Sequence, residues 1–101
     1  MTLLKLRKGE VSLVEEKVHP RAQAAGQAIR DLRLPAECVL AAVIRAGKLI
    51  IPRGDTVLQP FDEVLAVIHT AQLDALARVL GRMDDDVRPA ADSGQINDPR
   101  R

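Results

Sequence analysis

Few residues in this chain have the types and spacing that catalysis or metal binding requires. Ser12 and Ser93 have no histidine and carboxylate at a spacing typical of nucleophilic catalysis. Cys38 precedes an apolar run and is interpreted as a small core residue rather than a nucleophile. His19 and His69 stand alone, without a second His or Cys at metal-ligand spacing. The sequence therefore predicts a protein that is not an enzyme and holds no metal centre.

Two further patterns have simple structural explanations. The run Asp84–Asp86 resembles half of a calcium loop, but it lacks the regular oxygen spacing and the closing glutamate. It is interpreted as a solvated acidic run. Gly47, Gly54 and Gly81 each suit a turn or a helix end, so no glycine-rich phosphate loop is predicted.

The segment with the most chemical information is a basic and apolar hairpin between residues 42 and 67. Arg45, Lys48 and Arg53 are expected near one end of a sheet, beside the exposed edges of Leu49–Ile51. Apolar groups ringed by cations suit a nucleotide base and its phosphate. An ordinary hairpin with solvated charges explains the same residues, and this alternative stays open.

Composition narrows the classes of protein to which the chain can belong. Its 101 residues fit one domain, and 47% are hydrophobic while only 1% are aromatic. A net charge of +1 and the lack of Trp and Tyr argue against a nucleic-acid partner. No apolar run is long enough to insert into a bilayer, and the single cysteine suits a reducing compartment. We therefore expect a cytoplasmic protein.

Strands and helices are predicted in a definite order. Val11–Val18 is rich in β-branched residues and predicts a strand, which His19-Pro20 ends. Residues 22–32 have a helical pattern that Gly26 interrupts, so the secure helix is expected over Gln27–Leu32. Val39–Ile44 predicts a central strand covered on both faces.

The second half of the chain continues with a hairpin, a strand and a helix. Gly47 is expected to supply the positive φ of the hairpin turn before the return strand Leu49–Ile51. Val64–Ile68 predicts another buried strand. Thr70 is the expected N-cap of the last helix, with Gly81 as its C′ residue. The apolar stripe of this helix is expected at Leu73, Leu76, Ala77 and Leu80.

This order, strand-helix-hairpin-strand-helix, predicts an α+β fold with a mostly antiparallel sheet and two helices packed on one side. The other face or an edge is then available for dimerisation. Residues 1–10 are expected to be a flexible lead, 11–81 the folded domain, and 82–101 a disordered polar tail.

Several short motifs recur in a fixed order along the predicted domain. These are Ala25-Gly26, Leu32-Arg33-Leu34-Pro35, Val43-Ile44-Arg45-Ala46-Gly47, Ile50-Ile51-Pro52-Arg53-Gly54-Asp55-Thr56 and Phe61-Asp62-Glu63-Val64-Leu65. The succession resembles the RCK_C family, also called the TrkA C-terminal domain, over about Val11 to Gly81. One departure is Phe61, where that family usually has glycine.

The resemblance implies a cytosolic regulatory domain of potassium or cation transport, which works at the inner face of the membrane through a transporter or antiporter. That partner is in the same chain or in a separate subunit. The family forms homodimers, and some members bind cyclic di-AMP between subunits. By position, the ligand-binding residues implied here are Arg45, Ala46, Gly47, Ile50, Ile51 and Pro52. No G-x-G-x-x-G follows a strand, so binding of NAD or ATP is not carried over.

The leading hypothesis is a dimer whose subunit orientation is biased by a small anionic ligand. Cyclic di-AMP is the candidate, and no cofactor is assigned beyond it. One alternative is a structural dimerisation module without a ligand, and another is a small enzyme of unfamiliar type.

Overall fold

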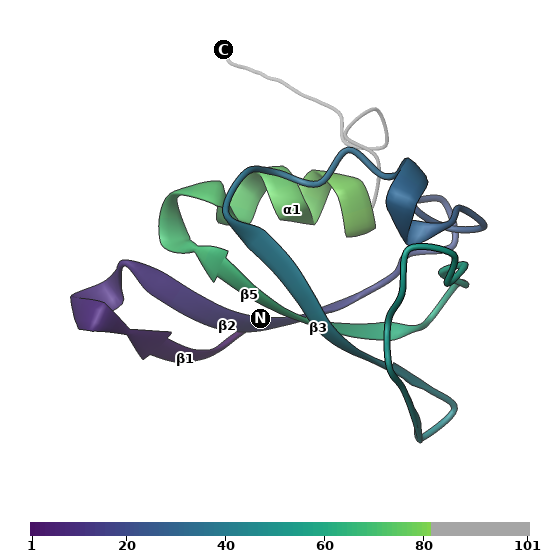
Figure 1. Ribbon diagram of the computed structural model, residues 1–101, viewed down its shortest axis with the longest axis horizontal. Helices are drawn as coiled ribbons and strands as arrows, with labels where there is room; N and C mark the ends of the chain where they lie inside the picture. The colour runs from purple at the N-terminus through teal and green to yellow at the C-terminus, as the bar shows by residue number, and fades with distance from the viewer. Residues whose placement is uncertain (82–101) are drawn as a thin grey trace, which may run out of the picture.

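The computed structural model describes residues 1–81, which form one five-stranded antiparallel sheet covered on one face by a helix (Figure 1). The strand order is β1-β2-β5-β3-β4. The α+β class and the mostly antiparallel sheet predicted from the sequence are confirmed. The strands are β1 (Thr2–Leu6), β2 (Val11–Lys17), β3 (Cys38–Arg45), β4 (Lys48–Ile50) and β5 (Glu63–His69). The helix is α1 (Leu73–Leu80), and the 3₁₀ turns are η1 (Arg7–Gly9), η2 (Ile29–Asp31) and η3 (Thr70–Gln72).

Strand β5 lies in the middle of the sheet, between β2 and β3. Its side chains alternate between the two faces, as a period of two requires. Val64, Ala66 and Ile68 are buried, whereas Leu65 and Val67 point to the opposite face. The neighbouring strands keep this register, because Val14 on β2 lies opposite Ala66.

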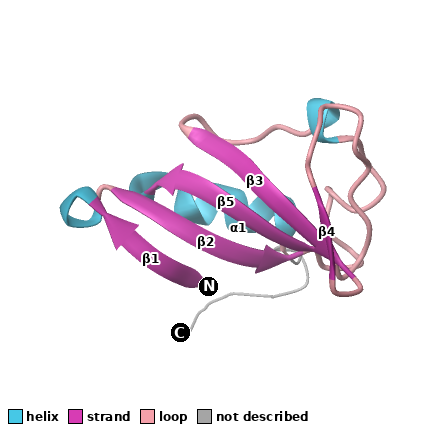
Figure 2. Ribbon diagram, turned by 60° about the horizontal axis from the view of Figure 1, so that its bottom comes forward, coloured by secondary structure: helices cyan, strands magenta, loops and turns pink. Residues whose placement is uncertain are grey.

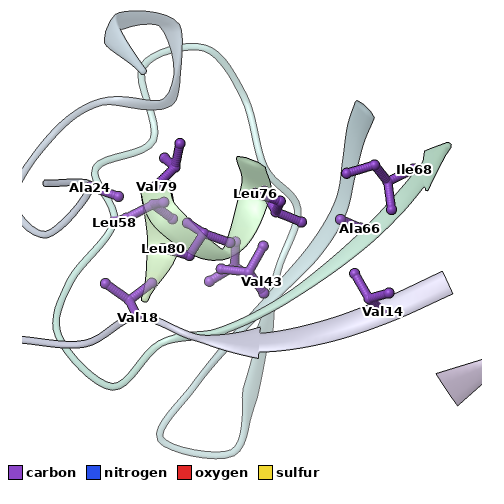
Figure 3. Close-up of a cluster of buried hydrophobic side chains, with 11 residues drawn as sticks. Val14, Val18, Ala24, Val43, Leu58, Ala66, Ile68, Leu76, Val79 and Leu80 are labelled. Carbon is purple, nitrogen blue, oxygen red and sulfur yellow. The ribbon is translucent and has the colours of Figure 1, made fainter. Parts of the chain in front are cut away.

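The buried core fills the space between the sheet and α1 (Figure 3). The buried face of the helix consists of Leu76, Val79 and Leu80. The predicted apolar stripe was therefore wrong at one position, because Ala77 is exposed and Val79 is buried. Leu58 is fully buried although it belongs to no helix or strand. The core is therefore closed by a loop as well as by the two layers. Its members are Val14, Val18, Ala24, Val43, Leu58, Val64, Ala66, Ile68, Leu76, Val79 and Leu80.

The opposite face of the sheet is open and largely apolar, with the charged residues Glu15, Lys17 and Glu63 at one end. Figure 2 shows α1 behind the sheet, and no element of residues 1–81 covers the near face. The apolar side chains of what we call the open face are Leu4, Leu6, Val11, Leu13, Val39, Ala42, Ile44, Leu49, Leu65 and Val67. Val39 is 63% exposed, so the prediction that both faces of this central strand are covered is wrong for residues 1–81 of a single chain.

The prediction of a helix over Gln27–Leu32 is also wrong. Only the short turn η2 forms, and α1 is the one α-helix among residues 1–81. Gly26 has a φ of 84°, and Ala28 is extended and forms a bridge with Val57. The amide of Ile29 donates to the carbonyl of Thr56 at 2.9 Å. Backbone pairing with residues 54–58 thus uses groups that a helix would have bonded internally.

The two ends of the last helical segment differ in detail from the sequence prediction. His69, not Thr70, caps η3, because its Nδ1 accepts a hydrogen bond from the amide of Ala71 at 3.1 Å. The Thr70 hydroxyl instead lies 2.8 Å from the hydroxyl of buried Ser12 and ties η3 to β2. Gly81 has a φ of −93°, so it is not a left-handed C′ residue. A Cβ at Gly81 would lie 2.5 Å from the carbonyl oxygen of Ala77. Lack of space for a side chain, and not a positive φ, therefore explains why glycine suits this position.

The first ten residues, expected to be a flexible lead, contribute β1 and η1. β1 pairs with β2 and carries the open face one strand further. The tail expected over residues 82–101 lies outside the described residues, and the boundaries of the domain stay a prediction. Within residues 1–81, no helix is long and apolar enough to cross a membrane.

Candidate functional site

The hairpin between β3 and β4 forms as the sequence predicts. Arg45 pairs with Lys48 across a two-residue turn. Both turn residues have positive φ, 51° at Ala46 and 78° at Gly47. This is the pattern of a type I′ turn, whose twist matches that of the flanking strands. The hairpin therefore holds Arg45 at a fixed place at the end of β3.

The connection from β4 to β5 is a loop with two ordered turns. In the first, the amide of Thr56 donates to the carbonyl of Arg53 at 3.1 Å, while the Thr56 hydroxyl accepts from the amide of Arg53 at 2.9 Å. In the second, the amide of Asp62 donates to the carbonyl of Gln59 at 3.1 Å. The first turn contains Gly54, which the sequence assigns to a turn or a helix end. Together the two turns bring Asp62 to the start of β5, next to the end of β3.

Arg45 and Asp62 form a two-pronged ion pair at this point. Nε of Arg45 donates to Oδ1 of Asp62 at 2.9 Å, and Nη2 donates to Oδ2 at 2.8 Å. Nη2 also donates to the carbonyl of Val57 at 2.9 Å, and Oδ2 accepts from the amide of Gln59 at 2.9 Å. The pair therefore fastens the hairpin to the loop. Planar, double hydrogen bonding of this kind is a strength of arginine that lysine lacks.

The charges of the pair stabilise one another. Burial by itself raises the pKa of Asp62, whose side chain is only 1% exposed. Hydrogen bonds from Arg45 and from the amide of Gln59, together with the positive charge, outweigh burial and hold this pKa below its ordinary value. The hydrogen bond to Asp62 raises the pKa of Arg45. Asp62 is thus a buried carboxylate that stays ionised.

The lowered pKa of Asp62 predicts a specific dependence of stability on pH. The folded state binds this proton less tightly than the unfolded chain does, so the stabilisation is complete above the unfolded pKa of about 3.9. It is lost as the pH falls through that value toward the folded pKa. We expect the difference in urea midpoint between the wild type and Asp62→Asn to be constant from pH 7 to 5 and to shrink between pH 5 and 3. A constant difference down to pH 3 would contradict this assignment.

A hollow of 370 Å³ opens beside the ion pair and is lined by residues 44–47 and 60–63. It brings together three of the predicted site residues, Arg45, Ala46 and Gly47. The other three are not in its lining: Ile50 packs against the core, Pro52 is half-buried, and Ile51 is 62% exposed. The hairpin thus divides the predicted ligand residues between the hollow and a neighbouring surface.

A second hollow, of 240 Å³, is lined by residues 17–20, Phe61 and Gly81. The side chain of Phe61 belongs to both hollows. Within residues 1–81, no group of three or more His, Cys, Asp or Glu side chains is placed to hold a metal ion.

Residues 13–81 match the family described as the TrkA-C domain. The chain belongs to this family. The Trk system potassium uptake protein TrkA homolog of Archaeoglobus fulgidus is 41% identical over 73 residues, which are 72% of this chain and 17% of that protein. The Trk system potassium uptake protein TrkA of Mycobacterium tuberculosis strain H37Rv is 32% identical over 78 residues, 77% of this chain and 36% of that protein. The chain therefore spans only between 17% and 36% of the length of these two relatives.

A solved structure described as "Structure of RCK domain with cda" has a similar fold. Its TM-score is 0.58 at 22% sequence identity, and the match covers 67% of this chain and 96% of that chain. At this identity the likeness shows the fold alone.

The site residues predicted for this TrkA-C domain do not include two loop residues that line the hollow, Asp62 and Phe61, although the sequence already marks Phe61 as a departure from the family's usual glycine. Asp62 is the partner of Arg45, but 17 residues separate them and no spacing rule joins them. Phe61 has a φ of 71°, the region that glycine favours. The departure from the family's usual glycine at this position was the available signal.

Proposed function

We propose that this chain is a non-catalytic regulatory domain of a potassium or other cation transport system. It pairs with a second copy and binds a small anionic ligand at the cleft between the two. Membership of the TrkA-C family supports the regulatory role, and the relatives named as Trk potassium uptake proteins support the transport system. The partner of the dimer is a transporter or antiporter at the inner face of the membrane.

The observation that carries the proposal is the open face of the sheet. Its residues lie in rows across neighbouring strands, and one row runs from Leu4 through Leu13 and Val67 to Val39. Leu4 is 52% exposed and Val39 is 63% exposed. A continuous apolar surface of this kind is typical of a protein interface. A second copy would bury it without requiring another type of partner.

The hairpin end of the same sheet supports binding of an anion. Nε and Nη2 of Arg45 are occupied by Asp62 and Val57, but its side chain is 33% exposed. A phosphate would approach the guanidinium from the hollow, while Ile51 and Pro52 offer apolar contact to a base. Cyclic di-AMP has two bases and two phosphates, so it could make the same contacts with each of two copies. The similar solved structure is that of an RCK domain with cda, which supports ligand binding by this fold.

The mechanism is a shift between relative orientations of the two copies. A ligand that contacts both copies favours the orientation in which both sets of contacts form. It can change that equilibrium only by the difference between its affinities for the two orientations. The favoured orientation then acts on the attached or associated transporter.

Calorimetric titration of cyclic di-AMP into the purified chain tests ligand binding. We expect saturation at one ligand per two chains, and at least tenfold weaker binding for Ile51→Ala, whose exposed side chain can be shortened without opening the core. Lys8→Ala, which removes a cation from η1, is the matched control and should bind as the wild type does. Cyclic di-GMP serves as the ligand control. No heat and no change in melting temperature with cyclic di-AMP would remove this ligand.

The second candidate function is a structural dimerisation module without a ligand. The open face favours it, because burying apolar side chains requires no small molecule. It predicts a stable dimer that gives no heat with cyclic di-AMP. The same titration, combined with sedimentation equilibrium, separates the two functions.

A further inference from the structure

Phe61 combines three properties that rarely occur together. It is the one aromatic residue of the chain, which has no Trp and no Tyr. Its φ of 71° places a bulky residue in a backbone region that favours glycine. The residue is nevertheless 65% exposed, so packing within residues 1–81 does not account for the ring. Strained backbone at an exposed residue is typical of a functional contact.

The backbone around Phe61 is held firmly enough to keep this conformation. The amide of Phe61 donates to the carbonyl of Val18 at 2.7 Å, and the amide of Val18 donates to the carbonyl of Asp62 at 2.8 Å. The carboxylate of Asp62 is in turn fixed by Arg45. The ring is therefore presented from a rigid turn, and little order is lost when it meets a partner.

The ring stands between two hollows at the end of the open face. The 370 Å³ hollow also contains Ile44 and Glu63, and the 240 Å³ hollow also contains Lys17. These three residues lie in one row across the sheet, since Lys17 pairs with Glu63 and Glu63 pairs with Ile44. Phe61 and both hollows thus border the open face that the proposed function assigns to the dimer, next to a row in which Lys17 and Glu63 are charged.

We propose that the ring of Phe61 in each copy inserts into the 240 Å³ hollow of the other copy, across a two-fold axis. This inference rests on the proposed function, in which two copies of the chain pair. It adds that Phe61 is the anchor, meaning the residue whose insertion holds the two copies together. A projecting ring beside a hollow on the same surface is the arrangement that a two-fold interface requires, because rotation places each ring over the other hollow. A cavity of about 150 Å³ is already enough for benzene, so the ring fits.

The chemistry of the hollow suits a phenyl ring and a second copy. Pro20 and Phe61 supply exposed apolar groups, and Lys17 stands at the lining as a cation that can lie against a ring. Lys17 and Glu63 are neighbours of opposite charge, so each copy presents both signs to its twin. The net charge of +1 produces little repulsion between two chains. A self-complementary surface therefore favours a second copy over another protein.

Sedimentation equilibrium of the full chain and of Phe61→Gly tests the proposal. We expect the dissociation constant of the dimer to rise at least tenfold in Phe61→Gly. The urea midpoint at a concentration where both proteins are monomers should stay the same or rise, because glycine relieves the strain at this φ. Phe61→Asn, which also tolerates positive φ, should weaken the dimer similarly. Val57→Ala, another exposed apolar residue of the same loop, should leave the dimer unchanged.

The outcomes distinguish this inference from the proposed function. A wild-type dimer that Phe61→Gly does not weaken would overturn the anchor and leave the pairing intact. A fall in the urea midpoint of monomeric Phe61→Gly would show that the ring packs within its own chain and would also overturn the anchor. A wild-type chain that is monomeric at millimolar concentration would overturn both the anchor and the pairing.

Discussion

Replacing Leu58 with alanine is expected to lower the free energy of unfolding by about 3–4 kcal/mol. The side chain is fully buried in the core, although it belongs to the loop before β5. Its backbone is fixed on both sides, since its carbonyl accepts from the amide of Gly26 at 2.7 Å and its amide donates to the carbonyl of Gln27 at 3.0 Å. The loop therefore has little freedom to collapse into the cavity. Urea denaturation followed by circular dichroism measures the loss.

Val57→Ala is the matched control for Leu58→Ala. Val57 is the preceding residue, and its side chain is 43% exposed, so its truncation should cost less than about 1 kcal/mol. Equal losses for the two variants would mean that Leu58 does not pack in the core as the structure has it.

Replacing Asp62 with alanine is expected to cost about 2–3 kcal/mol. The change removes the carboxylate that accepts from the guanidinium of Arg45 and from the amide of Gln59, and leaves Arg45 with the carbonyl of Val57 alone among the acceptors described above. Removing one partner of a fully buried pair costs about 3–5 kcal/mol, but a third of Arg45 is exposed and can be hydrated in part. The loss should appear in the urea midpoint at pH 7.

Two variants define the origin of this effect. Asp55→Ala removes an exposed carboxylate from the neighbouring turn and should change the free energy of unfolding by less than about 0.5 kcal/mol. Arg45→Ala combined with Asp62→Ala should cost less than the sum of the single changes, since the two residues share one interaction. Strict additivity would contradict the ion pair.

The sequence predicted the strands better than the segment before β3. The continuous apolar run Val64–Ile68 and the turn at Gly47 are local signals. A strand and a hairpin turn form there as expected, although only one face of the strand is buried. The helix expected at Gln27–Leu32 does not form because the amides of Ile29 and Arg30 donate to the carbonyls of Thr56 and Gly54, which lie much further along the chain. Helical propensity is a weak preference, and pairing with a distant segment overrides it.

Only the part of the candidate site that the hairpin contributes could be predicted from the sequence. Arg45 and Gly47 have local turn signals, and they do line the hollow. Asp62 joins them through the path of the loop, in which Leu58 is buried in the core, and the motif that contains Asp62 does not by itself indicate that it pairs with Arg45. The position of a loop between two strands follows from tertiary packing, so its charged partner could not be assigned from spacing.

The central position of β5 has a consequence for synthesis on the ribosome. β2 and β3 both pair with β5, which is translated last among the strands of residues 1–81. Until then this part of the nascent chain can form two separate hairpins, β1 with β2 and β3 with β4, and such hairpins are marginally stable in water. The sheet therefore remains unassembled until β5 has been made. Its apolar segments stay accessible to chaperones throughout this period.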